Sequence, residues 1–291
     1  MLKFLTRQLY GLAVGGSLLV FSAAMAWGWP LEAVVLGWSV LVLAGGVWLE
    51  RVAPFDQRWR RAQGDSAIDA TSAVVLIGLV DPLLQAALPV LAVATMARRS
   101  PDAGWLLGTL PFAAQVLAAL LWVELGKYAS HRAHHAWRSL WWLHALHHGS
   151  ERLYWLNNFR FHPLNHAVNT TVSLLPLLLL GAPREVLLAV AALTQPVLML
   201  QHLNVDTHSG WLNRVFSTNE QHRWHHSAEP QQANSNFGSA LMLWDQVFST
   251  FRHRAGAPVR IGLFGNGGGY PARASYRQQL LSMFAPACCR A

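Results

Sequence analysis

A long stretch almost without charge near the N-terminus is the feature that most constrains the fold. Residues 11–49 contain one charged side chain, Glu32, and the region of Pro30 divides them into two runs. Each run is close to the roughly 20 apolar residues that span a bilayer core. The pattern predicts a hairpin of two transmembrane helices. A secretory signal peptide is the alternative for the first run, which follows Lys3 and Arg7. The second run, directly after it, favours the hairpin.

Further apolar runs cover residues 67–97, 105–125, 168–180 and 186–200. Asp81-Pro82 interrupts the first of them, and a straight helix is doubtful there because proline removes a helix donor and clashes with the preceding turn. The last two runs are short for full crossings and predict a hairpin that dips into the membrane. Only 12% of the residues are charged, against roughly 25% in soluble domains. We therefore predict an all-α integral membrane protein with about four transmembrane helices and a short membrane hairpin.

The distribution of arginines predicts the orientation in the membrane. The loop at 50–65 carries Arg51, Arg58, Arg60 and Arg61, and short loops rich in Lys and Arg lie on the cytoplasmic side. This places the N-terminus, the histidine clusters and the basic tail on the cytoplasmic side of a bacterial inner membrane or its equivalent. One clean crossing by 67–97 would leave Arg98 and Arg99 outside, so that run is re-entrant or the rule fails locally. The net charge of +8 follows from this bias and does not indicate nucleic-acid binding.

The chain divides into three parts by composition. Residues 1–66 form the N-terminal hairpin and basic loop, 67–255 a membrane-embedded domain with the histidine clusters, and 256–291 a basic tail. Cys288 and Cys289, the only cysteines, are adjacent near the end and cannot form a disulfide framework or a thiolate metal site.

Two histidine clusters repeat one spacing. His144, His147 and His148 are spaced by three and one, and His222, His225 and His226 repeat this arrangement. On a helix such residues share one face. Neutral imidazoles that converge on a divalent cation are the stable solution for so dense a cluster. Two unrelated polar clusters at the membrane surface are the alternative.

Other histidines extend the candidate site. His131 and His135 lie on one helical stripe with Glu124 and Tyr128, whereas His134 lies off it and is predicted at the surface or an interface. His202 directly follows an apolar run, and His162 precedes a proline. His166 and His208 are weaker candidates, and His253, in the basic segment FRHR, is predicted to be a surface residue. The predicted metal ligands are His131, His135, His144, His147, His148, His202, His222, His225 and His226, with His162 as a tenth. One ion takes about four ligands, so this number predicts two metals.

The order of these segments resembles a known family. The stretches HRAHH, HALHH, RFHPLNH, QHLN and HRWHHS, followed by NFG and LWDQVFSTF, are similar to the fatty acid hydroxylase/sterol desaturase superfamily over roughly 122–251. The resemblance implies a helical membrane scaffold with a cytoplasmic cap, two non-haem irons, and O₂-dependent hydroxylation, or less favourably desaturation, of a sterol, fatty acyl chain or related lipid. Many relatives carry Glu where this chain has Asn165, which leaves the role of the His162 segment open.

Few carboxylates accompany the histidines. We predict that Glu124, Glu220 and Asp245 accept hydrogen bonds from ligand rings and fix their tautomers; helix capping or surface ion pairs are the alternative. No catalytic residue beyond the metal ligands is predicted. The chain carries no haem-attachment or flavin-binding signature, so a separate electron donor, cytochrome b5-like or ferredoxin-type, is expected.

Other functions of such a site remain open from the sequence. Imidazole suits iron and zinc alike, so a zinc-loaded membrane hydrolase or a redox-inactive relative is the main alternative, and zinc can occupy the purified protein. A metal transporter would carry histidines inside its spans, whereas these lie at the ends of the runs. Bis-histidine haem binding is a further alternative.

Overall fold

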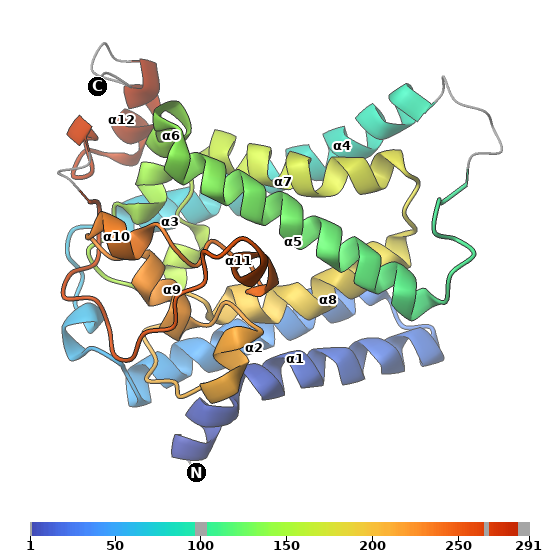
Figure 1. Cartoon of the computed structure of the whole chain (residues 1–291), viewed down its shortest axis with the longest axis horizontal. Coiled ribbons are helices and arrows are strands. Elements are labelled where there is room, and N and C mark those ends of the chain that lie inside the picture. The colour runs from blue at the N-terminus through green and yellow to red at the C-terminus, as the bar shows by residue number, and fades with distance from the viewer. Residues whose placement is uncertain (1, 97–103, 265–267, 285–291) are drawn as a thin grey trace.

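The computed structural model describes residues 2–96, 104–264 and 268–284 (Figure 1). Within these ranges all regular elements are helices, and β-pairing is limited to isolated bridges. Arg98, Arg99, Cys288 and Cys289, which entered the sequence predictions, lie outside the described residues.

Four helical segments are long and apolar enough to cross a membrane: Leu2–Trp27, Leu31–Val52, Ser66–Thr95 and Phe112–Ala136. The first two are α1 and α2. The chain turns between them at Gly28, where φ is +69°. Glycine adopts this conformation without steric cost. α1 packs against α2 and α8, as the hairpin interpretation expects. The prediction of four longer helices and a hairpin is confirmed.

The third segment continues through Asp81-Pro82 but changes its helical form. It consists of α3 (Ser66–Val75), the π-helical segment η2 (Leu76–Val80) and α4 (Asp81–Met96). A π-turn widens the helix by one residue, which relieves the clash that Pro82 would otherwise make with the preceding turn. The expected irregularity is therefore a π-turn just before the proline and not a break in the chain.

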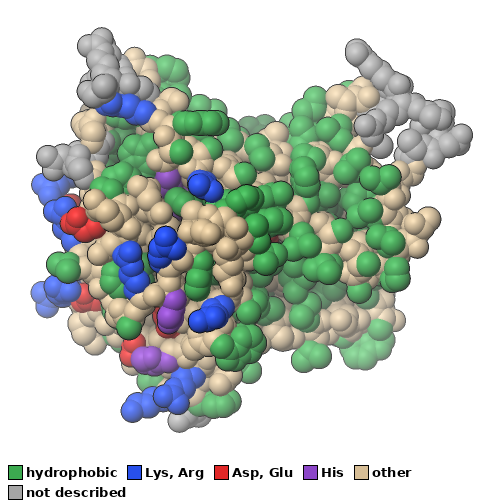
Figure 2. All heavy atoms as spheres, viewed as in Figure 1, with side chains coloured by type: hydrophobic (Ala, Val, Ile, Leu, Met, Phe, Trp, Pro, Cys, Tyr) green, Lys and Arg blue, Asp and Glu red, His purple; other side chains and the backbone are tan. Residues whose placement is uncertain are grey.

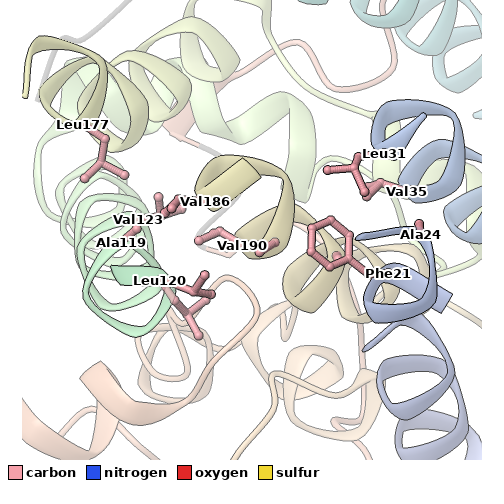
Figure 3. Packing of buried hydrophobic residues seen from close by; sticks show 13 residues of the cluster. Phe21, Ala24, Leu31, Val35, Ala119, Leu120, Val123, Leu177, Val186 and Val190 are labelled. Carbon is pink, nitrogen blue, oxygen red and sulfur yellow. The ribbon is translucent and has the colours of Figure 1, made fainter. Parts of the chain in front are cut away.

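The short hairpin lies at the centre of the helical bundle. α7 (Pro163–Leu179) packs against α4 and α5 (Phe112–Ala136), and α8 (Arg184–Leu200) packs against α1, α2 and α5. Figure 3 shows Val190 of α8 between Phe21 of α1 and Leu120 of α5, in one buried apolar cluster. At Gly126 a Cβ atom would lie 2.9 Å from Cα of Ser173, so glycine allows α5 and α7 to approach closely.

The short helices gather at one end of the bundle, and we refer to this end as the cap. It contains η1 (Gln57–Arg60), α6 (Arg138–His148), η3 (Trp155–Phe159), η4 (Gly210–Arg214), α9 (Asn219–His225), α10 (Pro230–Ala233), α11 (Leu243–Val247), α12 (Tyr276–Leu281) and η6 (Ser282–Phe284) (Figure 1). In Figure 2 the Lys, Arg, Asp and Glu side chains concentrate at this end, while the rest of the face is largely hydrophobic. The molecule thus has an apolar body and a charged cap.

Candidate metal centre

The structure brings nine histidines into two groups that can each hold a metal ion. Group A consists of His131, His135, His144, His148 and His225. Group B consists of His147, His202, His222 and His226. In each group the nitrogen atoms that can act as ligands all lie within 4.8 Å of one another. These nine are the histidines that the sequence analysis favoured.

Each repeated histidine cluster contributes to both groups. On α6, His144 and His148 belong to group A and His147 to group B. The cluster at the end of α9 reverses this division, since His222 and His226 belong to group B and His225 to group A. Residues four apart on a helix nearly overlie each other, so they point to the same group and the residue between them points to the other. The shared face predicted for each cluster is therefore split between two sites.

Burial keeps the cap histidines neutral. The side chains of His144, His147, His148, His222 and His226 are at most 3% exposed, and burial lowers the pKa of each well below its usual value of 6.5. For the same reason the pKa of His225 falls to about 4 and that of His202 to about 3. A neutral imidazole has the free lone pair that metal binding requires.

Hydrogen bonds orient two rings of group B, His147 and His202, toward a common point. His147 donates from Nδ1 to the carbonyl oxygen of Arg160 at 3.0 Å, and His202 donates from Nδ1 to Oδ1 of Asn158 at 2.7 Å. The Asn158 amide is fixed because its Nδ2 donates to the carbonyl of Met199. With the proton on Nδ1, each ring presents a lone pair on Nε2. The two Nε2 atoms lie 3.3 Å apart, so two acceptors face each other with no proton between them.

Group A shows the same arrangement. His131 donates from Nδ1 to the carbonyl of Phe237 at 2.8 Å, and His225 donates to the carbonyl of Ser235 at 2.9 Å. Nδ1 of His144 lies 3.1 Å from Oδ1 of Asn165, while its Nε2 lies 3.0 Å from Nε2 of His131. Nε2 of His135 and of His225 is buried and has no hydrogen-bond partner. Lone pairs that converge without donors fit a bound cation in each group.

The remaining histidines lie outside both groups. His162 caps α7, because its Nδ1 accepts the amide hydrogen of Leu164 at 3.1 Å. His166 contacts Asp81 at 2.6 Å, His208 lies 3.5 Å from Asp206, and His253 contacts Gln221. The tenth candidate ligand is thus a helix cap in this structure.

His134 corrects one prediction. It was expected at the surface or an interface, but its side chain is fully buried, and its Nδ1 donates to the carbonyl of Ser130 at 2.7 Å. The ring centroid lies 5.7 Å from that of His144. His134 does lie off the stripe of His131 and His135, but its ring is near His144 of α6, a contact between helices that the periodicity of one helix cannot indicate.

The three predicted carboxylates bind backbone and side-chain groups around the site. Oε2 of Glu124 accepts from the amides of Ala240 and Leu241, and Glu220 accepts from Ser209 and Asn213. Asp245 accepts from the amides of Phe237 and Gly238 and thereby fixes the segment whose carbonyl binds His131.

No hydrogen bond among the described residues joins these carboxylates to a candidate ligand ring. Backbone carbonyls and three asparagines take that role: Asn158, Asn165 and Asn234. These asparagines were not predicted from the sequence as ring partners. The only available signal was the position of Asn158 and Asn165 in the stretch NNFRFHPLN, between two histidine clusters.

A buried ion pair anchors the backbone that binds His147. Arg160 is 1% exposed and contacts Asp69 of α3 at 2.6 Å. Asp69 also accepts from Tyr154 and Asn157, so one carboxylate holds the segment 154–160. Full pairing is what makes such a buried charge tolerable. The acceptor of the His147 ring is therefore held by α3.

Fold and site together define a helical membrane protein built around a paired histidine centre that can hold two metal ions. Residues 116–250 match the family model described as fatty acid hydroxylase. This region of the chain is thus similar to fatty acid hydroxylases, and it contains both histidine groups.

Two curated proteins are similar to this chain. The chain is 37% identical to the ornithine lipid hydroxylase OlsE of Rhizobium tropici over 214 residues, which is 70% of this chain and 62% of that protein. It is 28% identical to an alkylglycerol monooxygenase of Caenorhabditis elegans over 124 residues, 43% of this chain and 24% of that protein. The chain thus spans less than two thirds of the length of either relative. No solved structure matches this chain.

Proposed function

We propose that the protein is an O₂-dependent di-iron oxygenase that hydroxylates a membrane lipid, with desaturation less favoured. The observation that carries the proposal is the pair of histidine groups whose Nε2 lone pairs converge without donors between them. The names of the two relatives, a lipid hydroxylase and a monooxygenase, support the reaction class.

The histidines of groups A and B would hold one iron each. When bound, the irons would supply the O₂ activation that an unactivated C–H bond requires. The chain would hold the ligand rings neutral, and acceptors at Nδ1 would fix the tautomer of six of the nine rings. It would also exclude water, since seven of the nine histidines are buried. Neither group contains a carboxylate. The side chains of the two groups are therefore neutral and would not compensate the positive charge of the ions.

The reaction requires two further participants. Hydroxylation places one oxygen atom of O₂ in the substrate and reduces the other to water, which consumes two electrons and two protons. We propose that a separate electron donor, cytochrome b5-like or ferredoxin-type, supplies the electrons at the charged cap (Figure 2). The cap would face the cytoplasm, since it carries the arginine-rich loop after α2. The lipid substrate would reach the centre laterally from the bilayer.

Metal analysis combined with oxygen consumption tests this proposal. Detergent-purified protein should contain about two irons per chain, and after chemical reduction it should consume O₂ and oxidise a lipid of the host membrane. His147→Ala should abolish both signals, whereas His208→Ala, at a side chain 62% exposed, should change neither. Zinc that iron cannot replace, or iron-loaded protein that consumes no O₂, would instead favour a zinc hydrolase or a redox-inactive relative.

A further inference from the structure

A pocket of about 410 Å³ opens in the cap at the end of α2. Its walls come from α2, η1, the first residue of α3, residues 152–155 and Asn204. The volume lies in the range of small-molecule sites. None of the residues that line it belongs to group A or group B, so the pocket is separate from the metal centre.

Two arginines without ion-pair partners line this pocket. Arg51 at the end of α2 and Arg60 in η1 are both exposed, and neither has a carboxylate within ion-pair distance in the part of the chain that the structure describes. Arg60 donates to the side-chain oxygen of Gln57 at 3.2 Å. Their positive charges are therefore available to a ligand.

The other charged groups of the pocket are engaged by the protein. Arg152, 4% exposed, binds both carboxylate oxygens of Asp65, at 2.6 and 2.9 Å. Glu50, 8% exposed, accepts through Oε1 from the amides of Trp155 and Asn204, both at 2.8 Å. It is the only acidic residue among those that line the pocket. Two unpaired guanidinium groups against one carboxylate give the pocket a net positive charge, which favours an anion.

The pocket also has an apolar side and lies where the membrane ends. Val47, Trp59 and Trp155 line it, and α2 begins at Leu31 and ends at Val52, next to the arginines. Tryptophan and arginine at the end of a span are typical of the headgroup region of a bilayer. A free inorganic ion would use only the arginines, whereas a lipid would contact both kinds of wall.

We propose that this pocket binds the headgroup of an anionic phospholipid. Arg51 and Arg60 contact its phosphate, and Val47 and Trp155 contact the glycerol and the first part of an acyl chain. This site does not depend on the proposed oxygenase activity, because it uses none of the nine histidines.

Native mass spectrometry of the full chain in detergent tests the proposal with short-chain phosphatidylglycerol as probe and short-chain phosphatidylcholine as reference. Wild type should bind phosphatidylglycerol more tightly than phosphatidylcholine. Arg51→Gln/Arg60→Gln should weaken phosphatidylglycerol binding by about tenfold or more, since a charge-assisted contact is worth that much. Both arginines are exposed, and glutamine is polar like arginine, so the fold should be retained.

Adjacent arginines provide a matched control. Arg61 is exposed like Arg60 but does not line the pocket, so Arg61→Gln should bind phosphatidylglycerol like wild type while Arg60→Gln binds it more weakly. Equal losses in the two single variants, or no loss in the double variant, would overturn the proposal. Binding of inorganic phosphate as tight as that of phosphatidylglycerol would also overturn it and would indicate a site for free phosphate. Metal content should be unchanged in all variants.

Discussion

Asparagine side chains and backbone carbonyls, and not carboxylates, are the hydrogen-bond partners of six of the nine candidate ligand rings. Asn158, Asn165 and Asn234 each place a side-chain oxygen near Nδ1 of a ring, at 2.7, 3.1 and 3.2 Å respectively. These neutral acceptors direct the Nε2 lone pair inward without adding negative charge. The choice of partner thus keeps the ring basicity lower than a carboxylate partner would.

Loss of the acceptor at Asn158 should weaken metal binding in group B. Asn158→Leu has a similar size but cannot accept from His202, so the ring can take the wrong tautomer. We expect about 10–100-fold weaker metal binding, measured by competition with a coloured chelator. Asn158→Asp keeps an acceptor and should retain most of the affinity. Wild-type affinity in Asn158→Leu would contradict the role of this hydrogen bond.

His147 and His162 should respond differently to the same substitution, although both were predicted ligands. His147→Ala removes a member of group B, so the purified variant should lose metal. His162→Ala removes the cap of α7, so it should keep its metal and lose about 1 kcal/mol of stability. Metal analysis and thermal unfolding of both variants check this. Metal loss in His162→Ala would return that residue to the ligand set.

At the scale of elements, α3 contributes to the site although it carries no histidine. Asp69 on α3 binds Arg160, Tyr154 and Asn157. These contacts fix the chain between the histidine cluster of α6 and the start of α7. The segment that presents Asn158 and the carbonyl of Arg160 to the rings therefore depends on an acid in a distant part of the sequence.

Removal of this acid should be costly. Asp69→Ala leaves Arg160 as a buried, unpaired charge and should destabilise the protein by about 3–5 kcal/mol. Glu151→Ala removes an exposed carboxylate 3.7 Å from Arg273 and should cause no measurable change. The midpoints of denaturant unfolding in detergent measure both effects. Equal midpoints for the two variants would show that the buried pair does not stabilise the fold.

Local patterns predicted the helical elements and nine histidines that the structure gathers into two groups, but not the hydrogen-bond partners of these histidines. The apolar runs indicated the four spans and the hairpin because membrane helices leave a direct record in hydropathy. Histidine spacing indicated eight residues of the two groups, and the position of His202 directly after an apolar run indicated the ninth. The burial of His134, the cap role of His162 and the partnership of Asn158 with His202 depend on contacts between segments far apart in the chain. No periodicity within one helix carries that information.

At the scale of the whole molecule, the metal ions would bind at the junction of the cap and the bundle. Group A joins α5, α6 and α9, and group B joins α6, the end of α8 and α9. Bound ions would therefore stabilise the native arrangement, as any ligand specific to the folded state does.

Removal of metal by a chelator should lower the unfolding temperature of the purified protein. Saturation at 100 times the dissociation constant corresponds to about 2.7 kcal/mol per site, so a shift of several degrees is expected in thermal unfolding. Added ferrous iron should restore it under anaerobic conditions. The same unfolding temperature with and without metal would argue against ions that bridge these helices.

The division of each histidine cluster between both groups links the occupancy of the two sites. When one ion orders α6 and α9 for group A, it also orders His147 and His222 for group B. Loading should therefore be positively cooperative. Chains titrated with half the saturating amount of metal should fall mainly into two populations in native mass spectrometry, one without metal and one with two ions. An excess of singly loaded chains would mean that the two sites fill independently.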